Sequence, residues 1–457
     1  MILLMKNWSW IPLTLLVLLL GACRTQPKTE ETQNLPALHE WAKNAIIYEV
    51  NVRQYTPEGT LQAFKAHLPR LAEMGVDILW LMPVHPIGEL NRKGSLGSYY
   101  AVKDYTAVNP EFGTLEDLKL VVAEAHKLGM KVILDWVANH SAWDNPWATT
   151  HPDFYEKDSS GQFLSPYDWT DVISFDYNNA EMRDSMLNAL KYWLTAADID
   201  GYRCDVAGMV PLDFWEHARM ELNKIKPVFM LAEDEDNVDL MKTAFEMNYG
   251  WNFHHHMNQI AKGEKTAADL WTYLDWNKER FSDTAFRMYF VTNHDENSWN
   301  GTIHERLGPA VDAFTVLSWT LPGMPLIYSG EESGETKRLR FFDKDTIDWS
   351  NQDRLAFYLK LNKLRTENPA LWSGFYGGEV QPFGLKDNPH LMSFFREKDK
   401  DKVVVILNLS GETQQLKTGD LQTDESYENY FTGEVMTWKG IREVDLDPWA
   451  YQVWIRK

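Results

Sequence analysis

Short apolar segments alternate with amphipathic ones along most of this sequence, and this alternation restricts the fold more than any other feature. The segment 131–140, KVILDWVANH, is an apolar run that ends in polar residues, as expected of a buried strand leading into a loop. The segment before it, 114–129, has apolar residues at helical spacing and lies between Thr114 and Gly129, a favourable helix start and stop. Nearly continuous apolar strands separated by helices predict a parallel sheet with helices on both faces.

Seven segments have this strand character, namely 45–55, 76–84, 131–140, 200–206, 227–234, 286–295 and 324–330. With the helices between them they make about eight strand–helix units, which predicts an α/β fold, a (β/α)8 TIM barrel over residues 40–373. Residues 141–180 lack a helical period and are predicted to form a short inserted subdomain after the third strand. Strand-like alternation with turn residues in 374–457 predicts a C-terminal antiparallel β domain, a β-sandwich.

The first residues form a separate unit. Residues 1–22 contain Lys6 followed by an apolar run that is too short to span a bilayer comfortably, which is typical of a secretory signal peptide. The sequence LGAC, ending at Cys23, resembles a bacterial lipobox, and this resemblance implies lipidation of Cys23. Residues 23–39 are polar and predict a flexible tether. Together they predict a membrane-anchored lipoprotein of the bacterial cell envelope, on the periplasmic or outer-membrane side, with an ordinary signal peptide or an uncleaved anchor as alternatives.

The amino-acid composition argues against some classes of binding partner. The formal net charge is −21, which argues against a nucleic acid partner and against binding through charge to an anionic membrane surface. The chain contains 20 Trp, 19 Tyr and 21 Phe, and their flat rings suit the apolar faces of sugars as well as a protein core.

Ionisable residues follow four of the predicted strands at the end where barrels of this type hold their active sites. In chain order they are Asp135, Asn139 and His140, then Arg203 and Asp205, then Glu233, and finally Asn293, His294 and Asp295. Any one of these residues alone would be interpreted as structural. Their repeated position in successive units predicts that they meet at one catalytic mouth.

Paired carboxylates in a cleft suit glycoside hydrolysis, in which one is ionised and another donates a proton. Arg203 and Asp205 lie two apart in a predicted strand, so they point to the same side. The guanidinium favours the ionised carboxylate and lowers the pKa of Asp205, as a nucleophile needs. Glu233, at the end of an apolar strand, suits the proton donor, and Asp295 is placed to hold sugar hydroxyls.

Four segments, 135–140, 201–208, 231–235 and 291–296, resemble in order and spacing the four sequence regions of the α-amylase family of glycoside hydrolases. The similarity extends over roughly residues 45–370. It implies a retaining hydrolase that cleaves α-glucosidic bonds, with α-1,4 links in starch-like glucans or maltooligosaccharides as the expected substrate.

The resemblance also implies roles for individual residues. Asp205 matches the nucleophile, Glu233 the general acid/base and Asp295 the residue that stabilises the transition state. The matched substrate-binding residues are Tyr100, which stacks on the sugar, His140, Arg203 and His294.

The resemblance implies no required cofactor but leaves a structural calcium ion open. Asn139 matches a calcium ligand of the family, whereas Met209 stands where calcium-binding members often have His, and the 141–180 insert is short. Three other functions stay open: a transglycosylase, an α-1,6-specific relative, and a non-catalytic lipoprotein that only binds glucan. The presence of all three carboxylates argues against the last, because binding alone needs neither a nucleophile nor an acid.

Overall fold

The computed structural model describes residues 39–384, 388–418, 424–438 and 443–457. The predicted signal peptide, Cys23 and all of the predicted tether except residue 39 lie outside these residues, so lipidation and anchoring stay predictions. Within the described part of the chain, no helix combines the length and apolar character that crossing a membrane requires.

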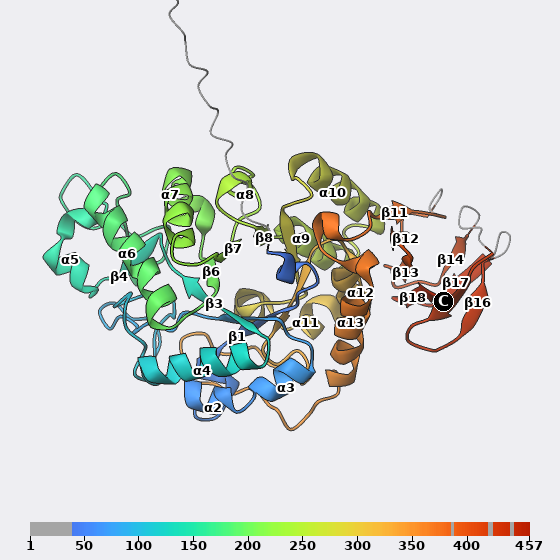
Figure 1. The fold of residues 1–457 in the computed structure, drawn as a ribbon, viewed down its shortest axis with the longest axis horizontal. Coiled ribbons are helices and arrows are strands. Elements are labelled where there is room, and N and C mark those ends of the chain that lie inside the picture. The colour runs from blue at the N-terminus through green and yellow to red at the C-terminus, as the bar shows by residue number, and fades with distance from the viewer. Residues whose placement is uncertain (1–38, 385–387, 419–423, 439–442) are drawn as a thin grey trace, which may run out of the picture. The chain divides into compact units, whose positions relative to one another are not determined.

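Eight parallel strands close into a barrel, in the order β1-β2-β3-β6-β7-β8-β9-β10 and back to β1 (Figure 1). Their bounds are β1 Ile47–Val50, β2 Ile78–Leu81, β3 Lys131–Trp136, β6 Gly201–Cys204, β7 Phe229–Ala232, β8 Met247–Tyr249, β9 Phe286–Tyr289 and β10 Met324–Tyr328. Every residue of these strands is buried except Lys131, as a sheet covered on both faces requires. The predicted (β/α)8 barrel is therefore confirmed.

Helices surround the barrel and connect its strands. Their bounds are α1 Val52–Tyr55, α2 Leu61–Lys65, α3 Leu68–Glu73, α4 Leu115–Lys127, α5 Pro146–Thr150, α6 Ala180–Ala196, α7 Leu212–Asn223, α8 Leu240–Thr243, α9 Trp251–Ala261, α10 Ala267–Arg280, α11 Ile303–Leu307, α12 Val311–Thr320 and α13 Leu355–Glu367. The helix predicted over 114–129 is α4, and Thr114 and Asp117 form a reciprocal capping box at its start.

The sequence prediction was wrong in two details of the barrel. The strand predicted over 45–55 ends at Val50, and the chain turns directly into the one-turn helix α1. The sixth strand, β8, was not recognised, because three residues are too few to show a period.

Alternating side chains of the strands point inward and fill the barrel with a closed apolar layer. This layer contains Ile47, Ile78, Ile133, Leu231, Met247 and Leu326. Gly201 opens β6 where no larger residue fits, because a Cβ there would lie 1.8 Å from the carbonyl oxygen of Phe229 in β7. The missing side chain lets β6 and β7 pair, and β6 carries Arg203 to the mouth.

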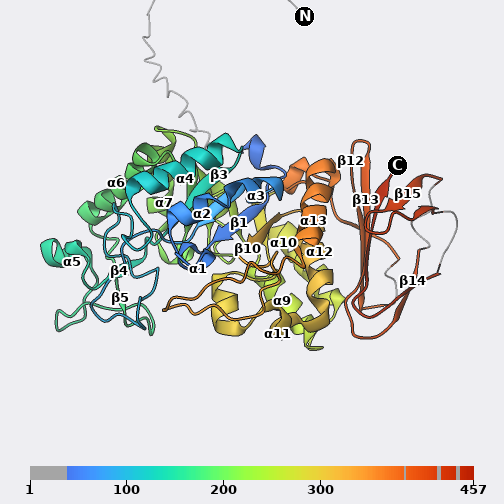
Figure 2. The same cartoon turned by 90° about the horizontal axis from the view of Figure 1, so that it is seen from below.

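The insert after β3 contains a two-stranded antiparallel sheet of β4 (His140–Ala142) and β5 (Val172–Ser174). Figure 2 shows this sheet and α5 at one end of the molecule, with the C-terminal strands at the other. The short helix α5 was not expected from the sequence. The insert thus starts at His140, one of the predicted site residues.

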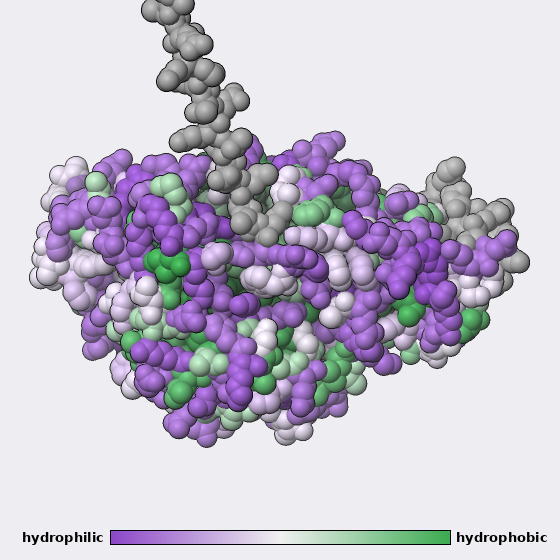
Figure 3. Space-filling model, viewed as in Figure 1, coloured by the Kyte–Doolittle hydropathy of each residue, from purple (hydrophilic) through white to green (hydrophobic). Residues whose placement is uncertain are grey.

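The C-terminal part is antiparallel, as predicted. One sheet has the order β11-β12-β13-β18-β15-β16, and β14 pairs with β17. The bounds are β11 Gln381–Pro382, β12 Leu391–Lys398, β13 Asp401–Asn408, β14 Gln414–Lys417, β15 Ser426–Asn429, β16 Val435–Thr437, β17 Glu443–Leu446 and β18 Tyr451–Arg456. Leu416 and Leu446 of the smaller pair share a core with Val404 and Trp454 of the larger sheet. The surface of the molecule in Figure 3 is largely hydrophilic and has only small apolar groups.

Candidate active site

A cavity of about 510 Å³ gathers the residues that follow the barrel strands. Of the predicted site residues it is lined by Tyr100, His140, Asp205, Glu233, His294 and Asp295. Arg203 is fully buried beside it and reaches two of these carboxylates, and Asn139 is not among the lining residues. Six side chains from five separate parts of the sequence therefore border one space.

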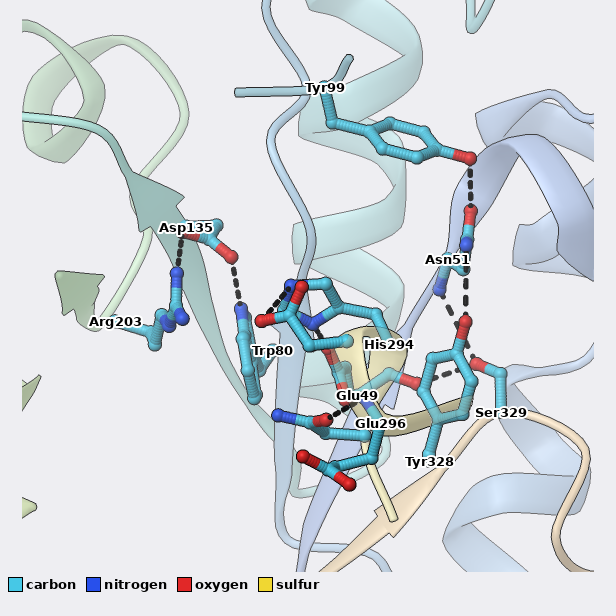
Figure 4. Close-up of polar contacts among 12 residues, drawn as sticks. Glu49, Asn51, Trp80, Tyr99, Asp135, Arg203, His294, Glu296, Tyr328 and Ser329 are labelled. Carbon is cyan, nitrogen blue, oxygen red and sulfur yellow. Dashed lines mark hydrogen bonds and ion pairs between the residues drawn. The ribbon is translucent and has the colours of Figure 1, made fainter. Parts of the chain in front are cut away.

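Arg203 is the structural anchor of the site. Its Nη1 donates to Asp135 Oδ1 at 2.9 Å and to Asp205 Oδ1 at 3.0 Å, while its Nη2 lies 2.7 Å from Glu233 Oε2. Its Nε donates to the Tyr249 hydroxyl at 3.0 Å. Figure 4 shows the guanidinium directed at Asp135, which also accepts from the Trp80 indole. The prediction that Arg203 and Asp205 face the same way is confirmed.

The electrostatics of Asp205 differ from the sequence prediction. Burial raises its pKa well above the usual aspartate range, Arg203 opposes this rise, and the Glu233 and Asp135 carboxylates add to it. Arg203 lowers this pKa as predicted, but the expectation that it keeps Asp205 charged was wrong, because burial and the Glu233 and Asp135 carboxylates outweigh the one cation. The free protein therefore holds a proton on Asp205 to higher pH than an exposed aspartate does.

A strained turn positions Glu233. Val206, directly after Asp205, has a left-handed backbone with φ 37° and ψ 48°, which is rare for a β-branched residue. This conformation directs the Val206 amide toward Glu233, and its N–H donates to Oε2 at 2.9 Å. The peptide unit between Asp205 and Val206 therefore connects the two candidate catalytic carboxylates, because its N–H binds Glu233.

His294 is held by hydrogen bonds at both ring nitrogens. Its Nδ1 lies 2.5 Å from Glu49 Oε1, and its Nε2 lies 2.8 Å from the Tyr100 hydroxyl. The Tyr100 hydroxyl donates its single proton to Asp135 Oδ2 at 2.9 Å, so Nε2 must be the donor toward Tyr100. With Glu49 ionised, Nδ1 is a donor as well, and the ring is an imidazolium.

The surrounding charges stabilise this imidazolium. Burial alone would lower the pKa of His294, but the carboxylates of Asp295 and Glu49 outweigh burial and raise the pKa to about 9. Asp295 Oδ2 lies 3.3 Å from Nε2. Figure 4 shows Glu49 reaching His294 from β1. His294 is therefore a cation that sits between two carboxylates at the edge of the cavity.

His140 has the opposite character. Burial lowers its pKa to about 3, so its ring is neutral. Its Nδ1 lies 3.2 Å from the side-chain amide nitrogen of Asn139, which has only hydrogens to offer. Nδ1 is then the acceptor and Nε2 carries the proton. His140 is thus set to donate a hydrogen bond without adding charge to the cavity.

Asn139, the expected calcium ligand, contacts His140 through its amide nitrogen Nδ2, whereas calcium would bind its oxygen Oδ1. Within the described part of the chain no group of three or more His, Cys, Asp or Glu side chains could hold a metal ion. Asp171, a buried carboxylate of the insert, lies 2.9 Å from Lys93 Nζ and is neutralised by it. Calcium therefore stays a prediction from the family resemblance, since Asn and backbone carbonyl oxygens also bind this ion.

Sequence reasoning missed three contributors to the site. Glu49 holds His294, Tyr249 accepts from Arg203, and Val206 orients Glu233. For Glu49 a signal was present, since a single charged residue stands inside the apolar segment IIYEV. For Val206 none was present, because valine normally disfavours a left-handed backbone.

The sequence model of the family described as "Alpha amylase, catalytic domain" matches residues 40–162 and 154–360, which is more than half of the chain. The chain belongs to this family. Its sequence is 28% identical over 403 residues to the α-amylase MalA of Haloarcula japonica, a match that covers 84% of this chain. The matched part spans only 58% of the length of that relative.

Two solved structures extend the likeness over nearly the whole described chain. An α-amylase from Lactobacillus plantarum has a TM-score of 0.80 and 30% identity, and the match covers 91% of this chain and 99% of that one. A maltogenic α-amylase, AmyB, from Thermotoga neapolitana has a TM-score of 0.83 and 28% identity with the same coverage. The family and the fold predicted from the sequence are both confirmed.

Proposed function

We propose that this α-amylase family protein is a retaining glycoside hydrolase that cleaves α-1,4 glucosidic bonds in starch-like glucans or maltooligosaccharides. The proposal rests on one observation about Glu233. Glu233 and Val206 line the first cavity and also a second cavity of about 620 Å³. Glu233 therefore stands at the junction of two spaces, where a glycosidic oxygen would lie with sugar on each side. Asp205 lines only the first cavity, as a nucleophile for the anomeric carbon should.

The reaction proceeds in two balanced steps. The first step starts from the state in which Asp205 is ionised and Glu233 carries the proton. An Asp205 carboxylate oxygen bonds to the anomeric carbon, the bond from that carbon to the glycosidic oxygen breaks, and Glu233 gives its proton to the departing oxygen. In the second, Glu233 takes a proton from water, the water oxygen bonds to the anomeric carbon, and Asp205 leaves. Configuration is retained because the carbon is inverted twice.

The remaining residues orient the sugar and balance charge. Arg203 holds Asp205 and Glu233 on one guanidinium, which fixes the distance between them. The neutral His140 offers an N–H donor to sugar hydroxyls. The cationic His294, whose two N–H groups face Glu49 and Tyr100, adds positive charge at the edge of the site. Asp295, the most exposed of the three carboxylates with 36% of its side chain accessible, faces the substrate space.

Release of reducing sugar from soluble starch tests the proposal directly. Chromatographic sizing of the products separates hydrolysis from transglycosylation, because a transglycosylase yields chains longer than the substrate. Pullulan, which contains α-1,6 links, separates the α-1,6-specific alternative. Inverted product stereochemistry by NMR, or no release of sugar from any α-glucan, would contradict the proposal.

The N-terminal predictions are proposed on the sequence alone. We propose that Cys23 is lipidated and holds the protein at a bacterial envelope membrane. A Cys23→Ser variant should lose the lipid and leave the membrane fraction or remain unprocessed. Unchanged processing and fractionation would contradict the proposal.

For calcium, the described residues form no cluster of three or more His, Cys, Asp or Glu side chains that could hold the ion, and we propose that the fold does not depend on one. Excess chelator should leave the thermal midpoint unchanged, because removing an ion that binds only the folded state would lower it. A lower midpoint that calcium restores would contradict this.

A further inference from the structure

The second cavity carries a strong excess of negative charge. Five acidic residues line it, namely Glu233, Asp234, Glu235, Asp236 and Glu296, and no lysine or arginine does. The first cavity is also lined by five acidic residues, but Lys93 and the cationic His294 line it too and offset part of their charge. The negative excess is therefore larger on the side of Glu233 that the second cavity occupies.

The neighbouring cations compensate this excess only in part. Arg306 Nη1 lies 3.8 Å from Glu296 Oε2 and offsets that carboxylate. Arg280 donates to the backbone carbonyl of Asp236 rather than to its side chain. The histidine that reaches Glu296, His254, is kept neutral by burial, which lowers its pKa. Within the described residues no lysine or arginine forms an ion pair with Asp234 or Asp236, although burial raises the pKa of Asp234.

The chain fixes these carboxylates in place. Asp234 Oδ1 accepts from the Asn237 amide at 2.6 Å, which holds the side chain in a turn. Its Oδ2 packs against Gly208, where an added Cβ would lie 2.0 Å away. Glu235 accepts from the Asn252 amide and from the Tyr273 hydroxyl. Burial raises the pKa of Glu235 to about 7, so it adds negative charge above that pH.

We propose that the second cavity binds the leaving-group part of the substrate and selects it by charge, accepting neutral or cationic groups and rejecting phosphorylated or carboxylated ones. This inference rests on the proposed function, because that function makes Glu233 the boundary between the two parts. A fixed negative potential lowers the local concentration of an anionic group and raises that of a cationic one. Sugar phosphates would accordingly be poor acceptors and poor leaving groups here.

The test uses three aryl α-maltosides whose phenyl ring carries an aminomethyl, a hydroxymethyl or a carboxymethyl group. The methylene keeps the acidity of the three phenols similar, so charge is the main difference. In low salt, kcat/KM should be about 10-fold higher for the cationic probe than for the anionic one, with the neutral probe between. Salt at about 0.5 M should reduce this ratio to roughly 2-fold.

Substitution locates the effect. Asp234→Asn and Asp236→Asn should each lower the cationic-to-anionic ratio by about 2–3-fold. The matched control is Asp239→Asn, which removes an exposed carboxylate from the same loop that does not line the cavity and pairs with Lys242. It should leave the ratio unchanged. Equal kcat/KM for the three probes in low salt, or an equal loss of preference in the control, would overturn the inference.

Binding of the same probes to the Asp205→Asn variant, measured by calorimetry, needs no turnover. Its dissociation constants should follow the same order of charge. If the wild-type protein cleaves neither starch nor the neutral probe, the proposed function fails, while the binding order still decides the inference. If the neutral probe is cleaved but charge has no effect, the inference alone fails.

Discussion

Arg203 and Arg396 are both fully buried, yet they have opposite surroundings. Arg203, at the mouth of the barrel, contacts the carboxylates of Asp135, Asp205 and Glu233. Arg396, in β12 of the C-terminal sheet, donates only to backbone carbonyls, those of Gly378, Thr320, Leu371 and Trp372. No carboxylate pairs with it among the described residues.

The surroundings change the ionisation of the two side chains in opposite directions. Burial would lower the pKa of Arg203, but its carboxylate partners raise it well above the usual value. Burial lowers the pKa of Arg396 well below the usual value, and the charge of Arg365 adds to this. A buried guanidinium thus organises reactive charges at the mouth, whereas at the contact with the C-terminal sheet it cross-links backbone from α12 and the segment after α13. Each of the following predictions tests part of this difference.

The largest expected effect comes from Asp205→Asn. Loss of the nucleophile should reduce starch hydrolysis on the order of 10⁴-fold or more. The same substitution should increase the thermal stability near neutral pH. Since the pKa of Asp205 is raised in the folded protein, its favourable contribution is present at low pH and is lost as pH rises through that pKa. Replacing it should therefore raise the thermal midpoint near pH 7, measured by calorimetry, and have less effect in acid.

Asp168→Asn is the matched control for this variant. Asp168 is exposed and lines the same cavity but has no assigned role in bond cleavage. Its activity should stay within a few-fold of the wild type. A lower midpoint in Asp205→Asn at pH 7 would show that the arginine needs all three carboxylates for stability.

Arg396→Met should lower the stability of the fold and leave the activity unchanged. The carbonyls of Gly378, Thr320 and Trp372 lose this donor, while the Leu371 carbonyl keeps its hydrogen bond from Arg365. Each lost hydrogen bond costs about 1 kcal/mol, so we expect a loss of about 3 kcal/mol in the free energy of unfolding. At temperatures well below the thermal midpoint of unfolding, kcat should not change, because Arg396 does not line the catalytic cavity. Urea denaturation and starch hydrolysis measure the two effects.

Arg456→Met provides the control on the same sheet. Arg456 pairs with Glu397 and Glu425, has 17% of its side chain exposed, and donates to one backbone carbonyl, that of Lys400, at the surface. Surface ion pairs of this kind contribute less than about 1 kcal/mol. A comparable loss in both variants would contradict the special role of the buried carbonyl contacts.

Glu49→Gln tests how the mouth keeps His294 charged. Without the Glu49 carboxylate, the pKa of His294 should fall from about 9 toward its ordinary value. A raised histidine pKa stabilises the fold fully below about pH 6.5, and that stabilisation is lost as pH rises through about 9. The variant should be less stable than wild type by about 2 kcal/mol near neutral pH. The difference should shrink above pH 9, and also in acid, where Glu49 becomes protonated because burial raises its pKa.

NMR titration of the His294 ring measures the pKa directly, and His294→Gln identifies its signal. An unchanged titration midpoint in Glu49→Gln would show that Asp295 alone keeps the ring charged.

The features that sequence predicts well are those that burial imposes on every residue of an element. The strands of the barrel are covered on both faces, so KVILDW in β3 reads as an apolar run, and the polar residues after it mark the mouth. The order of these runs then brings Asp205, Glu233 and His294 to one cavity without any contact being known.

Features that depend on register or tertiary strain could not be predicted. The guanidinium of Arg203 contacts the carboxylates of Asp135 and Glu233 because β3, β6 and β7 are neighbours at a particular register. The left-handed Val206 contradicts its own propensity and is held by its surroundings. The pKa of Asp205 depends on burial, which no local pattern reports.

The smallest expected effect concerns Lys93 and Asp171, a partly exposed counterpart of the Arg203 network. Lys93 Nζ lies 2.9 Å from Asp171 Oδ1, and the two side chains are 35% and 6% exposed. They join the loop after β2 to the insert after β3, and both line the catalytic cavity. Because water reaches the ammonium, we expect a coupling energy of only about 0.5–1 kcal/mol in a double-mutant cycle of Lys93→Met and Asp171→Asn. Salt at about 0.5 M should reduce this coupling, while kcat stays near the wild-type value and KM rises a few-fold. A coupling as large as the effect of Arg396→Met would mean that this pair, rather than the buried arginine alone, holds the insert over the site.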